Sequence, residues 1–109
     1  MTNTADRISL MCSIQRALLD EVTDDLYAVT CDIDDEKRIH IIAYFDGPVS
    51  EDGWDAINSV GGEVIADFPD DYRIEETCLD ANQIEPRCLD FWAFRRKRQP
   101  ARVPRMNEA

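Results

Sequence analysis

The chain has 109 residues, of which 44% are hydrophobic, with a formal net charge of −11 and a pI of about 4.3. This length predicts a single domain with a small core. The acidity disfavours nucleic acid and anionic membranes as partners and favours a basic protein, although the same charge can serve solubility alone.

The first predicted element is a helix that Thr4 or Asp6 can cap and that runs to about Glu21. Apolar residues at helical spacing form one stripe of it, as expected for a face packed on a core: Leu10, Met11, Ile14, Ala17, Leu18 and Val22. Two strands with alternating apolar residues follow, over 26–33 and 38–45. Because only the polar loop 34–37 separates them, they predict an antiparallel hairpin.

A second helix is predicted after the turn at Asp46-Gly47-Pro48. Ser50 is a suitable N-cap, and Pro69 stops the helix. The apolar positions recur at helical spacing: Trp54, Ile57, Gly61, Val64, Ile65 and Phe68. Gly61 and Gly62 each cost helix stability, about 1 kcal/mol, which close packing on the sheet or a kink would explain.

Two further strands are predicted over 72–79 and 89–96, separated by a loop that contains Pro86. Glu76 interrupts the apolar side of the first of them, which indicates an edge strand. The order helix–strand–strand–helix–strand–strand predicts an α+β two-layer sandwich, with two hairpins in one four-stranded antiparallel or mixed sheet and both helices on one face. We expect an acidic domain over 1–94 and a basic, flexible tail over 95–109.

The sheet face opposite the helices is apolar for an exposed surface. It would carry Ala28, Thr30, His40, Ile42, Tyr44 and either Trp92 or Phe91. An open face would be a contact patch, whereas a loop, the tail or a second subunit would otherwise cover it. The first case supports an alternative function, a homodimeric assembly module that pairs through Ile42, Tyr44 and Trp92.

The residue types needed for catalysis or metal binding form no recognised pattern. The four cysteines, Cys12, Cys31, Cys78 and Cys88, show no CxxC spacing, so nothing indicates a zinc site. Cys12 lies on the first predicted helix and Cys31 and Cys78 in predicted strands, so buried free thiols are expected. The single histidine, His40, has no nucleophile placed by a motif, and Glu75 and Glu76 are adjacent in a strand and so point to opposite faces. The loop 32–36 offers calcium-type ligands without EF-hand spacing. We expect no metal, no cofactor and no enzymatic activity.

Neither a signal peptide nor an apolar run near the roughly 20 residues of a membrane helix is evident. We therefore expect a cytoplasmic protein with reduced thiols.

The charge is divided unevenly along the chain. Residues 1–94 hold 6 Lys/Arg and 22 Asp/Glu, a net charge of −16, and residues 95–109 hold 6 and 1, a net charge of +5. Two acidic patches are predicted to face a partner: Asp67, Asp70, Asp71 and Glu75 at a helix–strand junction, and Glu51, Asp52 and Asp55 on the second helix. Such patches accelerate association with a basic protein. The alternative is a solvated rim, and the tail either folds back on the acidic face or is disordered.

Four segments, in order, resemble one group of small bacterial proteins: LYAVT, IIAYFDGPVSE, EVIADFPDDYRIEE and FWAFRRK. The likeness covers about residues 14 to 97, and the basic end is longer than the group leads us to expect. Members resemble the immunity proteins of contact-dependent growth inhibition and related polymorphic toxin systems. The resemblance implies binding to the C-terminal toxin domain of a cognate effector, commonly a nuclease. The matching residues look like fold determinants, so they identify no toxin contacts.

The combined hypothesis is an immunity protein that neutralises a basic toxin domain by electrostatic masking. Carboxylates of the two acidic patches would pair with the Lys and Arg that otherwise hold nucleic-acid phosphates. Tyr44 and Trp92 would supply aromatic anchors.

Overall fold

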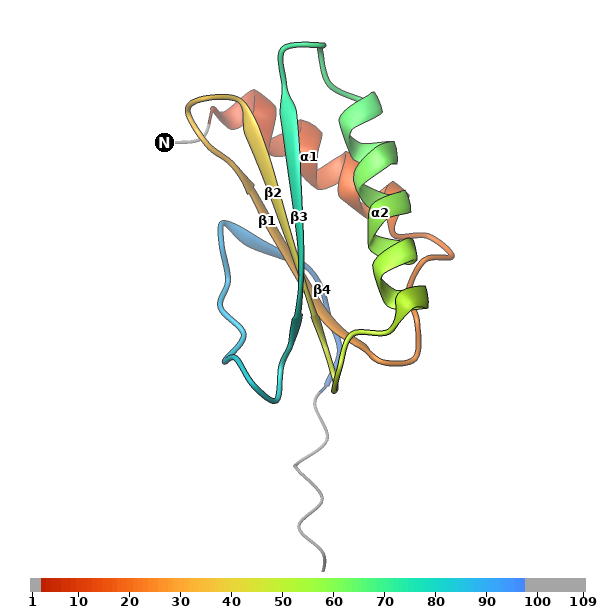
Figure 1. Ribbon diagram of the computed structural model, residues 1–109. Helices are drawn as coiled ribbons and strands as arrows, with labels where there is room; N and C mark the ends of the chain where they lie inside the picture. Colours follow the sequence, from red (N-terminus) through yellow and green to blue (C-terminus); the bar gives the residue numbers. More distant parts are fainter. Residues whose placement is uncertain (1–2, 98–109) are drawn as a thin grey trace, which may run out of the picture.

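The computed structural model describes residues 3–97, which form the predicted α+β fold (Figure 1). The elements are α1 (Thr4–Ala17), β1 (Leu26–Ile33), β2 (Arg38–Phe45), α2 (Glu51–Ala66), β3 (Arg73–Asp80) and β4 (Phe91–Arg95). Figure 1 shows both helices on one side of the sheet and the segment that joins β3 to β4 on the other. The predicted element order is confirmed. Most of the predicted tail, residues 98–109, lies outside the described residues.

The strands form one mixed sheet in the order β3-β2-β1-β4. The β1–β2 hairpin is antiparallel, as predicted, and β3 lies at an edge, as the position of Glu76 indicated. The predicted second hairpin is wrong, because β3 pairs in parallel with β2 while β4 pairs antiparallel with β1 at the opposite edge. Helix α2 carries the chain back along the sheet, so β3 runs in the same direction as β2. Residues 81–90 then cross the second face to reach β4.

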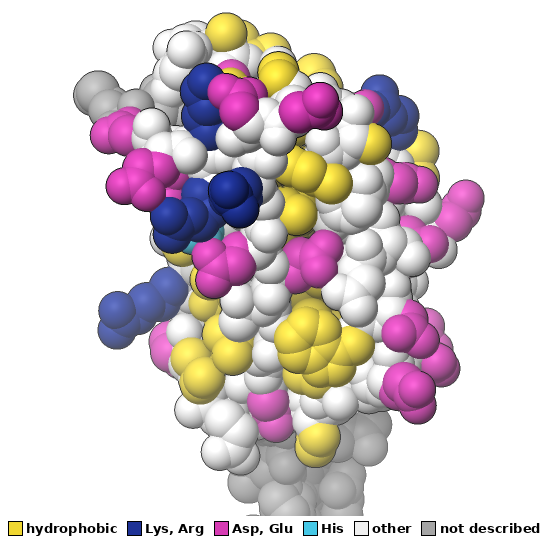
Figure 2. Space-filling view, turned by 45° about the horizontal axis from the view of Figure 1, so that its top comes forward, with side chains coloured by type: hydrophobic (Ala, Val, Ile, Leu, Met, Phe, Trp, Pro, Cys, Tyr) yellow, Lys and Arg dark blue, Asp and Glu magenta, His cyan; other side chains and the backbone are white. Residues whose placement is uncertain are grey.

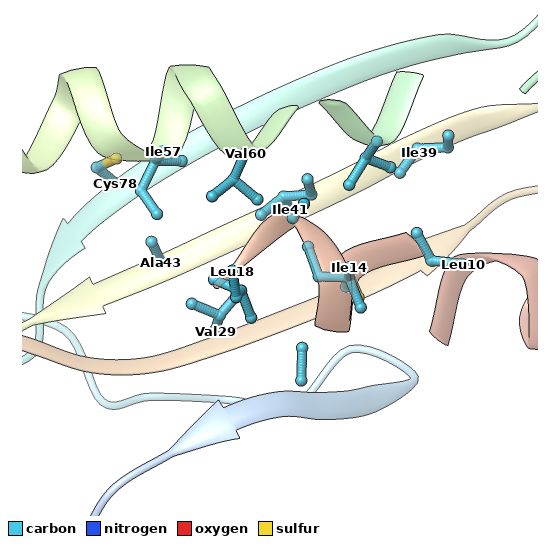
Figure 3. Packing of buried hydrophobic residues seen from close by; sticks show 14 of the residues in the cluster. Leu10, Ile14, Leu18, Val29, Ile39, Ile41, Ala43, Ile57, Val60 and Cys78 are labelled. Carbon is cyan, nitrogen blue, oxygen red and sulfur yellow. The ribbon is translucent and has the colours of Figure 1, made fainter. Parts of the chain in front are cut away.

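The core lies between the two helices and one face of the sheet (Figure 3). Figure 3 shows Leu10 and Ile14 of α1 and Val60 of α2 directed at the strands. Other fully buried core residues come from the central strands: Val29, Cys31, Ile39, Ile41 and Ala43. Complete burial of a Leu or Ile side chain contributes about 1.5–3 kcal/mol, so this layer supplies most of the stabilisation.

The helix ends differ from the prediction by a few residues. Asn3, rather than Thr4 or Asp6, caps α1, and its Oδ1 accepts the N–H of Ala5 at 2.8 Å. This helix ends at Ala17 instead of Glu21, because the chain turns there and Asp20 adopts a left-handed φ of 67°. The predicted cap of α2 is confirmed, since Ser50 Oγ accepts the N–H of Gly53 at 3.0 Å.

Helix α2 continues without a break through Gly61 and Gly62. Gly61 is buried against Glu76 of β3, whereas Gly62 has open space beside it. Of the two explanations considered for this pair, close packing on the sheet therefore holds for Gly61.

The cysteines divide into two buried and two exposed thiols. Cys31 and Cys78 are buried, and burial raises both pKa values, that of Cys78 to about 12. Cys12 and Cys88 are exposed, so the expectation of a buried thiol is wrong for Cys12. Cys12 lies on the side of α1 that faces away from the core, and Cys88 lies in the loop that precedes β4.

Candidate functional site

The acidic residues predicted at the junction of α2 and β3 are largely paired within the domain. Asp67 forms an ion pair with Arg16 and accepts a hydrogen bond from Ser13 Oγ at 2.6 Å. Asp71 lies 2.5 Å from Lys37 Nζ, and this hydrogen bond lowers the pKa of Asp71.

Glu75 and Asp70 complete the junction patch. Glu75 Oε2 lies 3.6 Å from His40 Nδ1. Asp70 is exposed and has no ion pair among residues 3–97. The negative charge of this patch is therefore reduced by a neighbouring Arg or Lys at two of its four carboxylates, Asp67 and Asp71.

The second predicted patch lies on the first turns of α2, where negative charge also favours the helix N-terminus. Glu51, Asp52 and Asp55 are exposed. Asp52 and Asp55 line a shallow pocket of about 300 Å³ together with Asp20 and Glu21 from the α1–β1 connection. Within the described chain none of these five carboxylates forms an ion pair, so they keep their charge for an outside partner.

A second hollow of about 420 Å³ lies beside the first, between the end of α1 and α2. Asp20 lines both hollows, and Glu63 and the exposed Leu19 line the second. We call the two hollows together the acidic groove, which is lined by the Arg16–Asp67 ion pair and by the unpaired carboxylates Asp20, Glu21, Asp52, Asp55 and Glu63.

Sequence reasoning missed Asp20, Glu21 and Glu63 as members of one site. The first helix was predicted to continue to Glu21, and a continuing helix would have placed Asp20 and Glu21 on a solvated helix surface. The turn after Ala17 brings both residues beside α2 instead. No local sequence signal indicates this contact between α1 and α2.

The second face of the sheet is partly covered by residues 81–90. Tyr44 is only 3% exposed, and its hydroxyl accepts the N–H of Arg87 at 3.1 Å. Trp92 is half-buried at 6.3 Å from Tyr44 between ring centroids, with the guanidinium of Arg95 above it. The loop of residues 81–90 therefore covers this part of the sheet face, and Tyr44 lies beneath it.

His40 is held by carboxylates in the polar half of the same face. Its Nε2 lies 3.2 Å from Asp34 Oδ2, and its Nδ1 faces Glu75. Its cross-strand neighbour is Asp32, whose Oδ1 is buried without a hydrogen bond and whose pKa is raised by that burial.

The loop that offered calcium-type ligands uses its central carboxylate in a turn. Asp34 Oδ1 accepts the N–H of Glu36 at 2.8 Å and that of Arg38 at 3.0 Å, and these bonds help to lower the pKa of Asp34. Among residues 3–97, no group of three or more His, Cys, Asp or Glu side chains is placed to hold a metal ion. No helix in this part of the chain is both long and apolar enough to cross a bilayer.

Comparison with known protein families gives a match to the MafI2 immunity protein model over residues 7–98. The chain belongs to the MafI2 immunity protein family. The match extends from the first turn of α1 to just beyond β4, so it includes every strand and both walls of the acidic groove. A search of curated proteins finds no match.

Membership of the MafI2 family makes the chain an immunity protein directed against a toxin. The resemblance to immunity proteins of bacterial toxin systems is confirmed at this level. The matching family is MafI2, and it does not specifically indicate contact-dependent growth inhibition. The partner implied by the family is a cognate toxin.

Proposed function

We propose that this MafI2 protein neutralises a basic nuclease toxin domain by masking the Lys and Arg residues that hold nucleic-acid phosphates. The observation that supports the proposal is the acidic groove, whose five carboxylates have no basic partner in the described chain. A net charge of −11 extends the same field over the whole molecule.

The acidic groove suits this task better than the junction patch. Asp67 and Asp71 already share their charge with Arg16 and Lys37, so a partner must compete with those ion pairs. The five unpaired carboxylates of the groove need no such exchange, although the Arg16–Asp67 pair also lines one of the two hollows. Electrostatic complementarity of this kind mainly accelerates association and selects the partner. Asp70 remains a proposed contact at the junction.

Apolar side chains at the rim of the groove add a second kind of contact. Leu19 is 69% exposed and Val22 is 45% exposed, and each lines one of the two hollows. Burial of apolar side chains by the toxin would strengthen a complex that charge alone brings together. Masking requires no chemical step, so the protein acts as a stoichiometric inhibitor in the cytoplasm, where the nucleic acids lie.

The first experiment identifies the toxin. The tagged full chain is expressed with its genomic neighbours, captured at low salt and eluted with rising salt. We expect a basic, neighbour-encoded domain that degrades RNA or DNA and that an equimolar amount of this protein inhibits. A bound toxin without nuclease activity, or one whose affinity is insensitive to salt, would contradict the masking proposal.

The groove is tested with a matched pair of charge reversals. Asp55→Lys changes the groove, and Glu85→Lys makes the same change in an exposed carboxylate on the 81–90 loop across the sheet. We expect D55K to slow association about tenfold at low salt and to flatten its salt dependence, with a smaller effect of E85K. Equal association rates for the two variants would remove the groove from the interface.

A further inference from the structure

The two edges of the sheet differ in the side-chain contacts that they receive from other elements. At β4, Gln15 Nε2 of α1 donates a hydrogen bond to the carbonyl of Ala93 at 2.6 Å. Arg7 lies over the ring of Phe91 at 5.5 Å and pairs with Asp90 just before the strand. At β3, no side chain of the described residues bonds to the outer backbone. Figure 1 shows β3 as the uncovered edge strand.

The ladder between β2 and β3 determines which backbone groups face outward. The N–H of Arg73 donates to Lys37 O at 3.0 Å, and the N–H of Ala81 donates to Phe45 O at 2.8 Å. Inward and outward groups alternate along a strand. The backbone groups of Ile74, Glu76 and Cys78 therefore point away from the sheet and remain available to an added strand.

Glu76 places an unpaired carboxylate at the middle of this open edge. Its side chain lies on the helix side of β3, against Gly61, and is half-buried. No Lys, Arg or His of residues 3–97 pairs with it. Inward-pointing charges on edge strands oppose indiscriminate pairing, because an arriving strand would bury the charge. A strand with Lys or Arg opposite Glu76 would instead gain a charge-assisted bond.

Trp54 provides an aromatic surface near the same edge. It is 40% exposed and lies seven residues before Gly61, on the same flank of α2. Figure 3 shows Ile57 of α2 beside Cys78, so the start of α2 lies at the C-terminal end of β3. Partly exposed tryptophans are frequent anchors at interfaces.

We propose that an extended segment of the toxin adds to the free edge of β3 and places a Lys or Arg against Glu76. This inference rests on the proposed function and specifies how the toxin is held. Figure 2 shows Asp and Glu, Lys and Arg, and exposed hydrophobic side chains mixed on one face of the molecule, so a segment that carries both basic and apolar residues would meet carboxylates and apolar side chains there. A second copy of this chain is a poorer occupant, because antiparallel pairing of two β3 strands would bring Glu75 and Glu76 towards the same residues of the copy.

The decisive measurement is amide hydrogen exchange of the full chain, free and bound to its purified toxin domain. We expect the amides of Ile74 and Glu76 to exchange at least about tenfold more slowly in the complex, because they gain strand hydrogen bonds. The alternate amides of Glu75 and Thr77 already bond to β2 and should change less. Unchanged exchange at Ile74 and Glu76 in a saturated complex would overturn the proposal.

Charge reversal at Glu76 provides the second test, with Glu85→Lys as the matched control. Glu76→Lys should accelerate dissociation by about tenfold or more, and the loss should persist at high salt because the contact is desolvated. E85K should leave dissociation unchanged. If E76K does not fold, the exchange measurement on the unmodified protein still decides. Failure of the unmodified protein to bind any neighbour-encoded toxin would refute the proposed function, whereas binding without protection of β3 refutes only edge pairing.

Discussion

The carboxyl group of Glu76 on β3 occupies the space that a β-carbon on Gly61 of α2 would fill. A β-carbon built at Gly61 overlaps this carboxyl group and lies 3.0 Å from Glu76 Cγ, whereas one built at Gly62 meets nothing within 4 Å. The first glycine therefore allows the helix and the edge strand to approach closely. No packing contact requires the second.

This difference predicts opposite results for two similar substitutions. Gly62→Ala should stabilise the fold by up to about 1 kcal/mol, because alanine favours a helix interior over glycine. Gly61→Ala should gain less or lose stability, because Glu76 must swing away. Urea unfolding of both variants measures the difference. Combining G61A with Glu76→Ala should restore the helix gain, and equal stabilisation by G61A and G62A would contradict the packing described.

The same carboxylate predicts a dependence of stability on pH. Burial raises the pKa of Glu76 above its ordinary value of 4.5. The folded protein therefore takes up this proton at a higher pH than the unfolded chain, and its stability gains as the pH falls through the folded pKa towards 4.5. Glu76→Gln should be more stable than the unmodified protein at neutral pH, and this advantage should shrink over that interval.

Urea unfolding of E76Q and of the unmodified protein at several pH values measures how the stability advantage of E76Q shrinks. Asp34 and Asp71 act in the opposite direction, because hydrogen bonds lower their pKa values, so their contribution is lost as the pH falls below about 3.8. They titrate in both proteins and cancel in the difference. A difference between E76Q and the unmodified protein that stays constant with pH would contradict the assignment to Glu76.

Loss of the Thr30 hydroxyl group should lower the stability of the fold considerably. Thr30 Oγ1 accepts the N–H of Leu89 and donates to the carbonyl of Phe91, each at 2.8 Å, and the side chain is buried. Thr30→Val keeps the shape but removes both hydrogen bonds, which should cost about 1–3 kcal/mol. Thermal and urea unfolding measure the loss. Thr30→Ser retains the hydroxyl and should lose less than T30V.

Removal of the Tyr44 hydroxyl group should loosen the covering loop, residues 81–90, without changing toxin affinity. The hydroxyl accepts the Arg87 N–H and lies 3.4 Å from the Arg87 carbonyl, to which it can donate. Tyr44→Phe should reduce stability by about 0.5–1.5 kcal/mol and speed amide exchange at Arg87. Toxin affinity, measured by calorimetry, should remain unchanged because the residue is buried. A clear loss of affinity in a folded Y44F would restore the direct contact that the sequence predicted.

The sequence predicted the elements well where neighbouring residues decide the structure. Alternating apolar residues and a four-residue loop were sufficient for the β1–β2 hairpin, and Ser50 and Pro69 bracket α2. The partners of β3 and β4 depend on a helical crossover and on residues 81–90, which bridge distant parts of the chain. Local turn chemistry cannot distinguish that arrangement from a second hairpin.

The sequence predicted the negative charge of the candidate site but not which of its carboxylates form ion pairs. Composition alone indicated a basic partner, and the patch at the start of α2 is exposed as expected. Asp67 and Asp71, however, meet Arg16 and Lys37, which lie 51 and 34 residues away in the chain. Only the fold brings these groups together, so the sequence could not show which carboxylates keep a free charge.

The position of β1 in the middle of the sheet has a consequence for the order of folding. During synthesis, β1 and β2 emerge first and can pair at once, but the other edge of β1 stays open until residues 91–95 have left the ribosome. Contacts between such distant residues form slowly, and an exposed central strand invites aggregation. A chain truncated before β4 should therefore be a substrate for chaperones and proteases, and a cell is protected only by molecules that have been translated through their last strand.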